Sequence, residues 1–189
     1  EVPLGATIPA YYGLLASRYM HEHGNTERDF AALAVAMRSH AATHPGAQFR
    51  TPITVDEVLA SKPVASPLKL LDCCPVSDGG AAFVVSRERT NDFAVRITGT
   101  AQAHTHQHVS AAPSLTQFGS AQSSRNALGA AGRKLDDVDY AAIYDSFTIT
   151  LAILLEEIGL APRGQAGRLA AEGWFSRTDG LPLNTHGGL

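Results

Sequence analysis

The stretch DDVDYAAIYDSFTITLAILLEEIGL, residues 136–160, decides the fold. Residues 140–143 predict a strand, residues 144–146 a turn, and residues 147–158 a helix. Gly159 ends that helix, because glycine readily adopts the left-handed conformation of a helix C-cap. A strand that leads through a short turn into a helix is the building unit of α/β proteins, so this stretch favours that class.

The segments before this unit alternate in the same way. GAAFVVSRE (residues 80–88) and FAVRITGTAQA (residues 93–103) predict strands, because β-branched and aromatic residues are frequent in them. The first is nearly all apolar before its charged end, which is typical of a strand that is covered on both faces. Residues 113–135 predict a helix with small residues on one side. Alternating helices and buried strands favour a layered α/β architecture.

The first third of the chain predicts helices. PAYYGLLASRYMHEHG (residues 9–24) and NTERDFAALAVAMRSHAATHPG (residues 25–46) carry apolar residues at helical spacing and predict two amphipathic helices joined by a tight turn. Asn25 or Thr26 is the expected N-cap of the second helix. TVDEVLAS (residues 54–61) has the spacing of a capping box, with threonine first and glutamate three residues later, and predicts a short third helix.

Composition excludes several function classes. The net charge is -3, from 15 basic and 18 acidic residues without a long run of either sign, so no surface for nucleic acid is indicated. No apolar run reaches the ~20 residues that a membrane span needs. The two cysteines, Cys73 and Cys74, are adjacent, which is poor geometry for a disulfide, and we expect buried, reduced thiols in a cytoplasmic protein.

Two sets of residues could carry chemistry. The turn YDSFT (residues 144–148) joins a strand to a helix, where α/β proteins often bind ligands. Structural roles are also open, since Asp145 or Ser146 can cap the helix and Tyr144 can be a strand-end aromatic residue. The second set is His104, His106 and His108, spaced two apart; without a nearby carboxylate or cysteine they indicate a polar edge, and we expect no metal site.

Three stretches together resemble the thiolase superfamily, in its sterol-carrier-protein-x or lipid-transfer-protein branch. They are PLKLLDCCPVSDGGAAFVVS (residues 67–86), IYDSFTITLAILLEEIGL (residues 143–160) and GLPLNTHGGL (residues 180–189). The resemblance implies part of a five-layered α/β/α/β/α fold with a helical loop-domain excursion in the first third of the chain.

The resemblance also implies a domain organisation. Residues 1–65 are expected to be a mainly helical loop-domain region, residues 66–110 the end of the N-terminal thiolase half, and residues 111–189 the start of the C-terminal half. In thiolases a glycine-histidine motif follows the asparagine-glycine loop, and the nucleophilic cysteine lies well before the region that matches Glu1. We therefore expect this sequence to be the middle of a longer thiolase-like chain, without a complete catalytic apparatus.

Tyr144 departs from the usual family pattern, which has histidine or asparagine before the turn. This departure resembles the thiolase-like aldolases of steroid side-chain degradation, which cleave a β-hydroxyacyl-CoA by retro-aldol chemistry and work with a small zinc-ribbon and OB-fold partner protein. Coenzyme A then enters as part of the substrate, with no permanently bound cofactor. The implied catalytic residues are Tyr144, Asn184 and His186. The implied substrate-binding residues are Asp145, Ser146, Gly187 and Gly188.

Two other functions remain open at the level of sequence. One is a thiolase-type acetyl-CoA acyltransferase, which would need a reactive cysteine. The other is a non-catalytic carrier of lipid or acyl-CoA on the same scaffold. For any of these functions the resemblance implies a homodimer.

Overall fold

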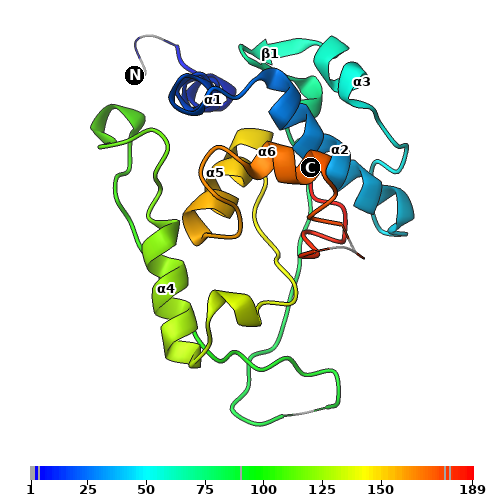
Figure 1. Cartoon of the computed structure of the whole chain (residues 1–189). Coiled ribbons are helices and arrows are strands. Elements are labelled where there is room, and N and C mark those ends of the chain that lie inside the picture. Colours follow the sequence, from blue (N-terminus) through cyan, green and yellow to red (C-terminus); the bar gives the residue numbers. More distant parts are fainter. Residues whose placement is uncertain (1–2, 4, 90, 177, 179) are drawn as a thin grey trace.

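The computed structural model of the chain describes residues 3, 5–89, 91–176, 178 and 180–189. Three helices fill its first third, as the sequence predicts (Figure 1): α1 (Ile8–His23), α2 (Glu27–Thr43) and α3 (Val55–Ala60). Gly24 ends α1 in the left-handed conformation, with φ 72°. Thr26 and Thr54 begin the next two helices, each with a capping box. The predicted helix starts and ends in this region are therefore confirmed.

Short elements connect the longer helices. A two-stranded antiparallel hairpin, β1 (Pro63–Ala65) and β2 (Leu68–Lys69), runs into the 3₁₀ turn η2 (Leu70–Asp72). The later elements are η3 (Val109–Ala111), α4 (Ser120–Ala131), η4 (Leu135–Asp137), α5 (Thr148–Ile158) and α6 (Ala166–Ala171). The hairpin and α6 were not predicted, because both are too short for a periodic pattern.

Helix α5 lies at the centre of the hydrophobic core. Its residues are buried on all sides, as is typical of a helix that is apolar all round. Helices α1, α2 and α6 pack around it, as Figure 1 shows. The largest fully buried side chains are those of Tyr19, Phe30, Phe175, Leu33, Met37, Leu68, Ile149, Leu151, Ile153, Leu155, Leu183 and Val58. This packing fixes the N-terminal end of α5, and with it the YDSF turn.

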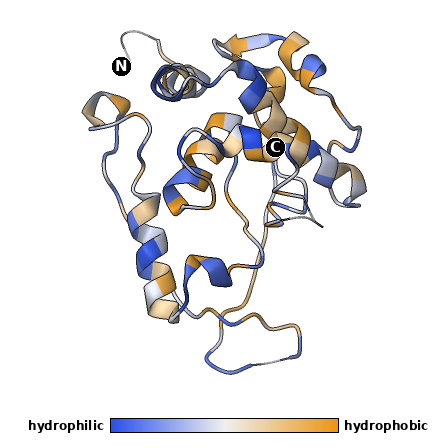
Figure 2. Ribbon diagram, in the orientation of Figure 1, coloured by the Kyte–Doolittle hydropathy of each residue, from blue (hydrophilic) through white to orange (hydrophobic). Residues whose placement is uncertain are grey.

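The prediction of strands at residues 80–88 and 93–103 was wrong. Neither is a strand in the described part of the chain, and their apolar side chains face solvent: Val84 is 93 % and Phe93 94 % exposed. Figure 2 shows apolar residues along this loop at the edge of the molecule. The physical reason is that a strand takes its hydrogen bonds from a neighbouring strand, and no described segment pairs with these residues.

The predicted strand at residues 140–143 is reduced to one contact. Ala141 forms an isolated parallel bridge with Leu183, so the segment is aligned with the C-terminal loop without forming a continuous sheet. Of the helices in the described ranges, none is long and apolar enough to cross a membrane.

Candidate functional site

The YDSF turn is anchored from its helical side. Phe147 is the N-cap of α5, with extended backbone, and its ring stacks on that of Tyr12 from α1 at a centroid distance of 4.3 Å. Ser146 is buried, and its Oγ lies 3.2 Å from Thr150 Oγ1, one helical turn further on. The turn is therefore held by side chains of two helices.

Asn184 joins the C-terminal loop to the end of the 140–143 segment. Its side chain is 1 % exposed and hydrogen-bonds both backbone groups of Ile143: Oδ1 accepts from N–H, and Nδ2 donates to the carbonyl, each at 2.8 Å. Nδ2 also donates to Asp145 Oδ2 at 3.1 Å. The amide thus makes the two hydrogen bonds to Ile143 that the backbone of a neighbouring strand would make. Its backbone has φ 43°, a left-handed conformation that asparagine tolerates better than most residues.

Asp145 holds the far end of the same loop. Its Oδ2 accepts hydrogen bonds from Asn184 Nδ2 and from the backbone N–H of Leu189, at 3.0 Å for the latter. Burial raises the pKa of the Asp145 carboxyl above its ordinary value, although these hydrogen bonds and the charge of His186 act in the opposite direction. Asp145 and Asn184 together therefore fasten residues 184–189 to the strand-end turn, and we call this arrangement the loop clamp.

The two loop glycines lie against α2. Gly187 is buried with φ 125°, and a Cβ there would come 2.8 Å from the Cβ of Ala41. Gly188 has φ 55°, and a Cβ there would overlap Asp145 Oδ2 and approach Met37. Both positions therefore require glycine, for conformation and for space.

The third motif meets the same turn. Thr148 Oγ1 donates to the buried Asp72 Oδ1 at 2.9 Å, and the N–H of Cys74 donates to the carbonyl of Ser146 at 3.0 Å. Cys73 forms an isolated antiparallel bridge with Phe147. The structure thus brings together the three stretches from which we inferred the family resemblance.

The cysteines in this motif are not activated. Burial, followed by the charges of Asp72 and Cys74, raises the pKa of the Cys73 thiol to about 11. Burial also raises the pKa of the Cys74 thiol, with Asp145 nearby. Both are free thiols; Cys73 is half-buried and Cys74 is exposed, which corrects the expectation that both are buried. Neither thiol is disposed to form the thiolate that a nucleophile needs.

Two predicted site residues lie outside the loop clamp. Tyr144 is 74 % exposed, and its hydroxyl makes no hydrogen bond to any residue that the structure describes. His186 is exposed on the loop. Ser146 and Gly187 are buried, and Gly188 is exposed. The predicted residues therefore divide into a buried set that fixes the backbone and an exposed set whose side chains or backbone groups face outward.

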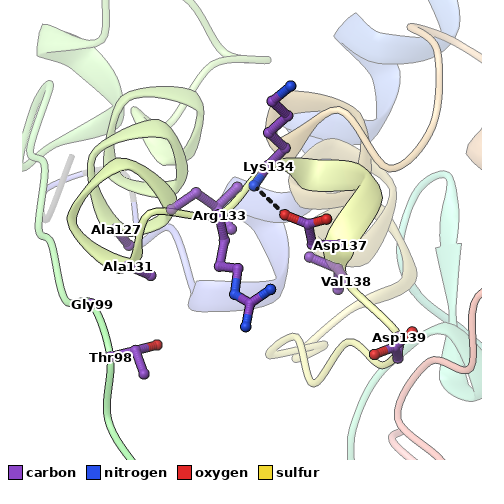
Figure 3. A pocket seen from close by; sticks show the side chains of 10 residues that line it. Thr98, Gly99, Ala127, Ala131, Arg133, Lys134, Asp137, Val138 and Asp139 are labelled. Atoms are coloured by element: carbon purple, nitrogen blue, oxygen red, sulfur yellow. Dashed lines mark hydrogen bonds between the residues drawn. The ribbon is translucent and has the colours of Figure 1, made fainter.

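Two cavities lie elsewhere in the described residues and include none of the predicted site residues. One, of about 390 Å³, is formed by α4, η4 and residues 98–99. Figure 3 shows Arg133 extending into it, whereas the ammonium group of Lys134 points away and its backbone N–H donates to Asp137 Oδ2 at 2.8 Å. The other, of about 500 Å³, is formed by α1, residues 103–118 and α5.

Comparison with known proteins agrees with this arrangement. A family model described as "Thiolase C-terminal domain-like" matches residues 101–189. A solved structure, an Ltp2-ChsH2 aldolase, superimposes on 99 % of this chain and 52 % of its own with a TM-score of 0.87 and 34 % identity. The chain is a homologue of thiolase-superfamily proteins. The predicted thiolase fold is thereby confirmed, although the described residues themselves form only a small sheet.

Curated thiolase-superfamily relatives match over the whole sequence. The steroid side-chain-cleaving aldolase of Thermomonospora curvata is 39 % identical over 99 % of this chain and 51 % of its own length. The acetyl-CoA acetyltransferase of Methanothermobacter thermautotrophicus is 35 % identical over 100 % of this chain and 51 % of its own length. The chain thus spans about half the length of the curated relatives that it matches.

Several contacts of the site were not foreseen from the sequence. They are the hydrogen bond between Asp72 and Thr148, the stacking of Tyr12 on Phe147, and the packing of the glycine loop against α2. Asp72 had a detectable pattern, since a lone carboxylate between Leu71 and Cys73 in an apolar run indicates a buried, hydrogen-bonded charge. The other contacts join segments far apart in sequence and leave no local pattern.

Proposed function

We propose that the protein is a thiolase-superfamily enzyme that cleaves a carbon–carbon bond of a β-hydroxyacyl-CoA by a retro-aldol reaction, on a substrate such as a steroid side-chain CoA thioester. The relative from Thermomonospora curvata, which its name describes as a steroid side-chain-cleaving aldolase, supports this proposal, as does the solved Ltp2-ChsH2 aldolase. Because the chain spans about half of each, the proposal concerns the whole protein.

The observation that carries the proposal is the position of Tyr144. Its backbone immediately precedes Asp145, so the loop clamp keeps the residue beside the glycine loop, while its hydroxyl bonds no described residue. The family resemblance implies histidine or asparagine at this place in acyltransferases. A phenol can accept a proton where neighbouring groups stabilise its anion, which a neutral asparagine cannot do.

In the proposed reaction Tyr144, as its anion, accepts the proton of the substrate β-hydroxyl. The β-oxygen then forms a carbonyl group as the bond between the α and β carbons breaks. The electron pair of that bond passes to the enolate of the thioester, which is finally protonated at its α carbon. The enolate oxygen carries the developing charge, so the reaction needs hydrogen-bond donors at that position.

The loop supplies a candidate donor for the enolate. The N–H groups of Gly187 and Leu189 are used by the carbonyl of Asn184 and by Asp145, whereas that of Gly188 has no partner within the described ranges. We propose that the Gly188 amide and the exposed His186 side chain interact with the thioester oxygen. Gly187 then permits the close approach, and the buried Ser146 shapes the turn.

The buried polar residues have a different role in this proposal. Both hydrogens of the Asn184 amide are used by Ile143 and Asp145, so Asn184 acts by positioning the loop. Asp145 does the same through Leu189. The amide hydrogens of Asn184 would have to leave Ile143 and Asp145 before they could bind a substrate.

The test is the turnover of the full-length protein with Tyr144→Phe. Loss of a general base typically lowers kcat by about 10²- to 10⁴-fold, and we expect a loss in that range with an unchanged melting temperature and acyl-CoA affinity. Tyr140→Phe is the matched control, since Tyr140 lies four residues earlier and is also exposed. Normal turnover by Tyr144→Phe would remove the tyrosine from the mechanism.

The same turnover assay of the full-length protein distinguishes the proposed aldolase from two other functions. An acetyl-CoA acetyltransferase, the activity named for the relative from Methanothermobacter thermautotrophicus, would transfer acyl groups through a cysteine other than Cys73. A non-catalytic carrier on the thiolase scaffold would bind the thioester without turnover.

We further propose a homodimer, acting in the cytoplasm, and a small zinc-ribbon and OB-fold partner protein. The name of the solved relative joins two components, Ltp2 and ChsH2, which supports an assembly with a partner. Two free cysteines support a reducing compartment.

A further inference from the structure

The cavity beside α1 has the character of a binding site for an apolar group. Its volume is about 500 Å³, within the range of roughly 300–1,000 Å³ for small-molecule sites. Leu15, Leu115, Phe118 and Leu154 give it apolar walls, and they come from α1, from the 103–118 segment and from α5. Figure 1 shows that this segment, in green, rises from α4 toward the end of α1.

Two residues of the cavity wall contact the YDSF turn. Thr150 lines it, and the hydroxyl of Thr150 lies 3.2 Å from that of Ser146. Tyr12 also lines it, and the ring of Tyr12 stacks on that of Phe147. Tyr12 and Thr150 therefore belong both to the cavity wall and to the surroundings of the turn at which we propose the thioester to react.

Two histidines make part of the wall polar. His106 is half-buried, and its Nδ1 shares a hydrogen bond with Thr105 Oγ1 at 2.8 Å. Its Nε2 bonds none of the residues described by the structure. His104 is more exposed, and its Nε2 lies 2.6 Å from Gln102 Nε2. An imidazole nitrogen donates or accepts according to its tautomer, and a hydroxyl group can satisfy either.

We propose that this cavity binds the hydrocarbon part of the acyl group and that His106 hydrogen-bonds a polar substituent on it, remote from the thioester. The inference rests on the proposed function and narrows its substrate class to bulky apolar acyl groups that carry a hydroxyl or keto group. A purely apolar chain would leave the His106 nitrogen without a partner once water is displaced, and this is the physical origin of the selectivity.

The test compares the affinity of the full-length protein for decanoyl-CoA and for its ω-hydroxy analogue, measured by calorimetry. Neither compound has a β-hydroxyl group, so neither undergoes retro-aldol cleavage and the measurement reports binding alone. We expect the hydroxylated thioester to bind about fivefold more tightly, the value of one hydrogen bond. His106→Phe should abolish this preference. His108→Phe, a histidine outside the cavity and two residues further along, should keep it.

A second variant tests the location. Leu154→Trp adds bulk to the cavity wall and should weaken the binding of both thioesters by about tenfold or more. Leu14→Trp is its control, because Leu14 lies on α1 outside the cavity and is already exposed. Affinity unchanged by Leu154→Trp, or a preference that survives His106→Phe, overturns the inference while the proposed function stands. Failure of the parent protein to bind either thioester overturns both.

Discussion

Gly188 is the residue on which the shape of the loop depends most directly. It has φ 55°, and a Cβ at this position would occupy the space of Asp145 Oδ2 and lie 3.1 Å from the Cγ and Sδ atoms of Met37. A methyl group here must therefore push the loop away from its carboxylate anchor. The hydrogen bond between Asp145 and the Leu189 N–H would then be lost.

Gly188→Ala separates this clash from ordinary backbone strain. Alanine at a positive φ costs about 1 kcal/mol through conformation alone, and we expect a further ~1–2 kcal/mol from the overlap with Asp145. Gly132→Ala is the matched control, because Gly132 has φ 64° and open space at its Cβ position. Chemical denaturation of both variants checks this expectation, and equal losses of unfolding free energy would contradict it.

At the residue scale, sequence reasoning selected three segments that the structure brings together, but it could not assign their contacts. The Asn184 side chain was expected to face a substrate, yet it bonds Ile143, forty-one positions earlier in the chain. Nothing local to Asn184 specifies this pairing, because it depends on the parallel alignment of Ala141 with Leu183. Gly187 and Gly188 were more accessible to prediction, since adjacent glycines indicate a close backbone approach.

Among the elements, the helices were predictable where residues close to their ends specify where they begin and end. Thr26 and Thr54 cap through side chains three residues away, and Gly24 and Gly159 end helices through their own conformation. The six-residue helix α6 (Ala166–Ala171) has no such marks: the Gln165 side chain caps nothing, and Gly167 lies within the helix. A helix this short is stabilised by its packing on α2, which the sequence does not display.

The link between Asp72 and α5 makes the stability of the protein depend on pH. Burial raises the pKa of the Asp72 carboxyl above its ordinary 3.8, despite hydrogen bonds from Lys69 and Thr148. The native state therefore binds this proton more tightly than the unfolded state. The resulting stabilisation is complete below the ordinary pKa and is lost as the pH rises through the raised native pKa.

Asp72→Asn removes this titration and keeps an acceptor for Thr148. The unfolding free energy of the parent minus that of the variant should therefore fall as the pH increases from below 4 through the raised pKa, and then become constant. Denaturant titrations at a series of pH values measure this difference. Asp145, whose pKa is also raised, is present in both proteins, so its contribution cancels in the difference of unfolding free energies. Parallel curves for the two proteins would show that Asp72 does not titrate in this way.

For the whole molecule, the dominant feature is an apolar surface on residues 76–97. The exposed side chains are those of Val76, Phe83, Val84, Val85, Phe93, Val95 and Ile97. An unpaired stretch of this composition is characteristic of a surface that is covered in an assembly or by another part of the fold.

We expect the full-length protein to be a dimer in solution. The family resemblance implies a homodimer, and an apolar surface of this kind favours association. Light scattering coupled to size-exclusion chromatography at micromolar concentration measures the mass directly. A mass equal to that of a single full-length chain would contradict the expectation.

The same surface explains where prediction of the fold stopped. Residues 80–88 have the composition of a buried strand, and composition reports which environment a segment suits. It does not supply the neighbouring strand that completes the hydrogen bonds. The helices of the first third make their hydrogen bonds internally, and their sequence patterns were therefore sufficient.

The loop clamp has a consequence for protein engineering. The conformation of residues 184–189 is encoded jointly by Ile143, Asp145 and the C-terminal half of α2, which receives the two glycines. A graft of this loop into a homologous scaffold would leave behind the residues of the turn and of α2 that fix its conformation. A chimera that preserves the loop must transplant the strand-end turn and the matching turns of α2 with it, so the exchangeable module of this protein is discontinuous in sequence.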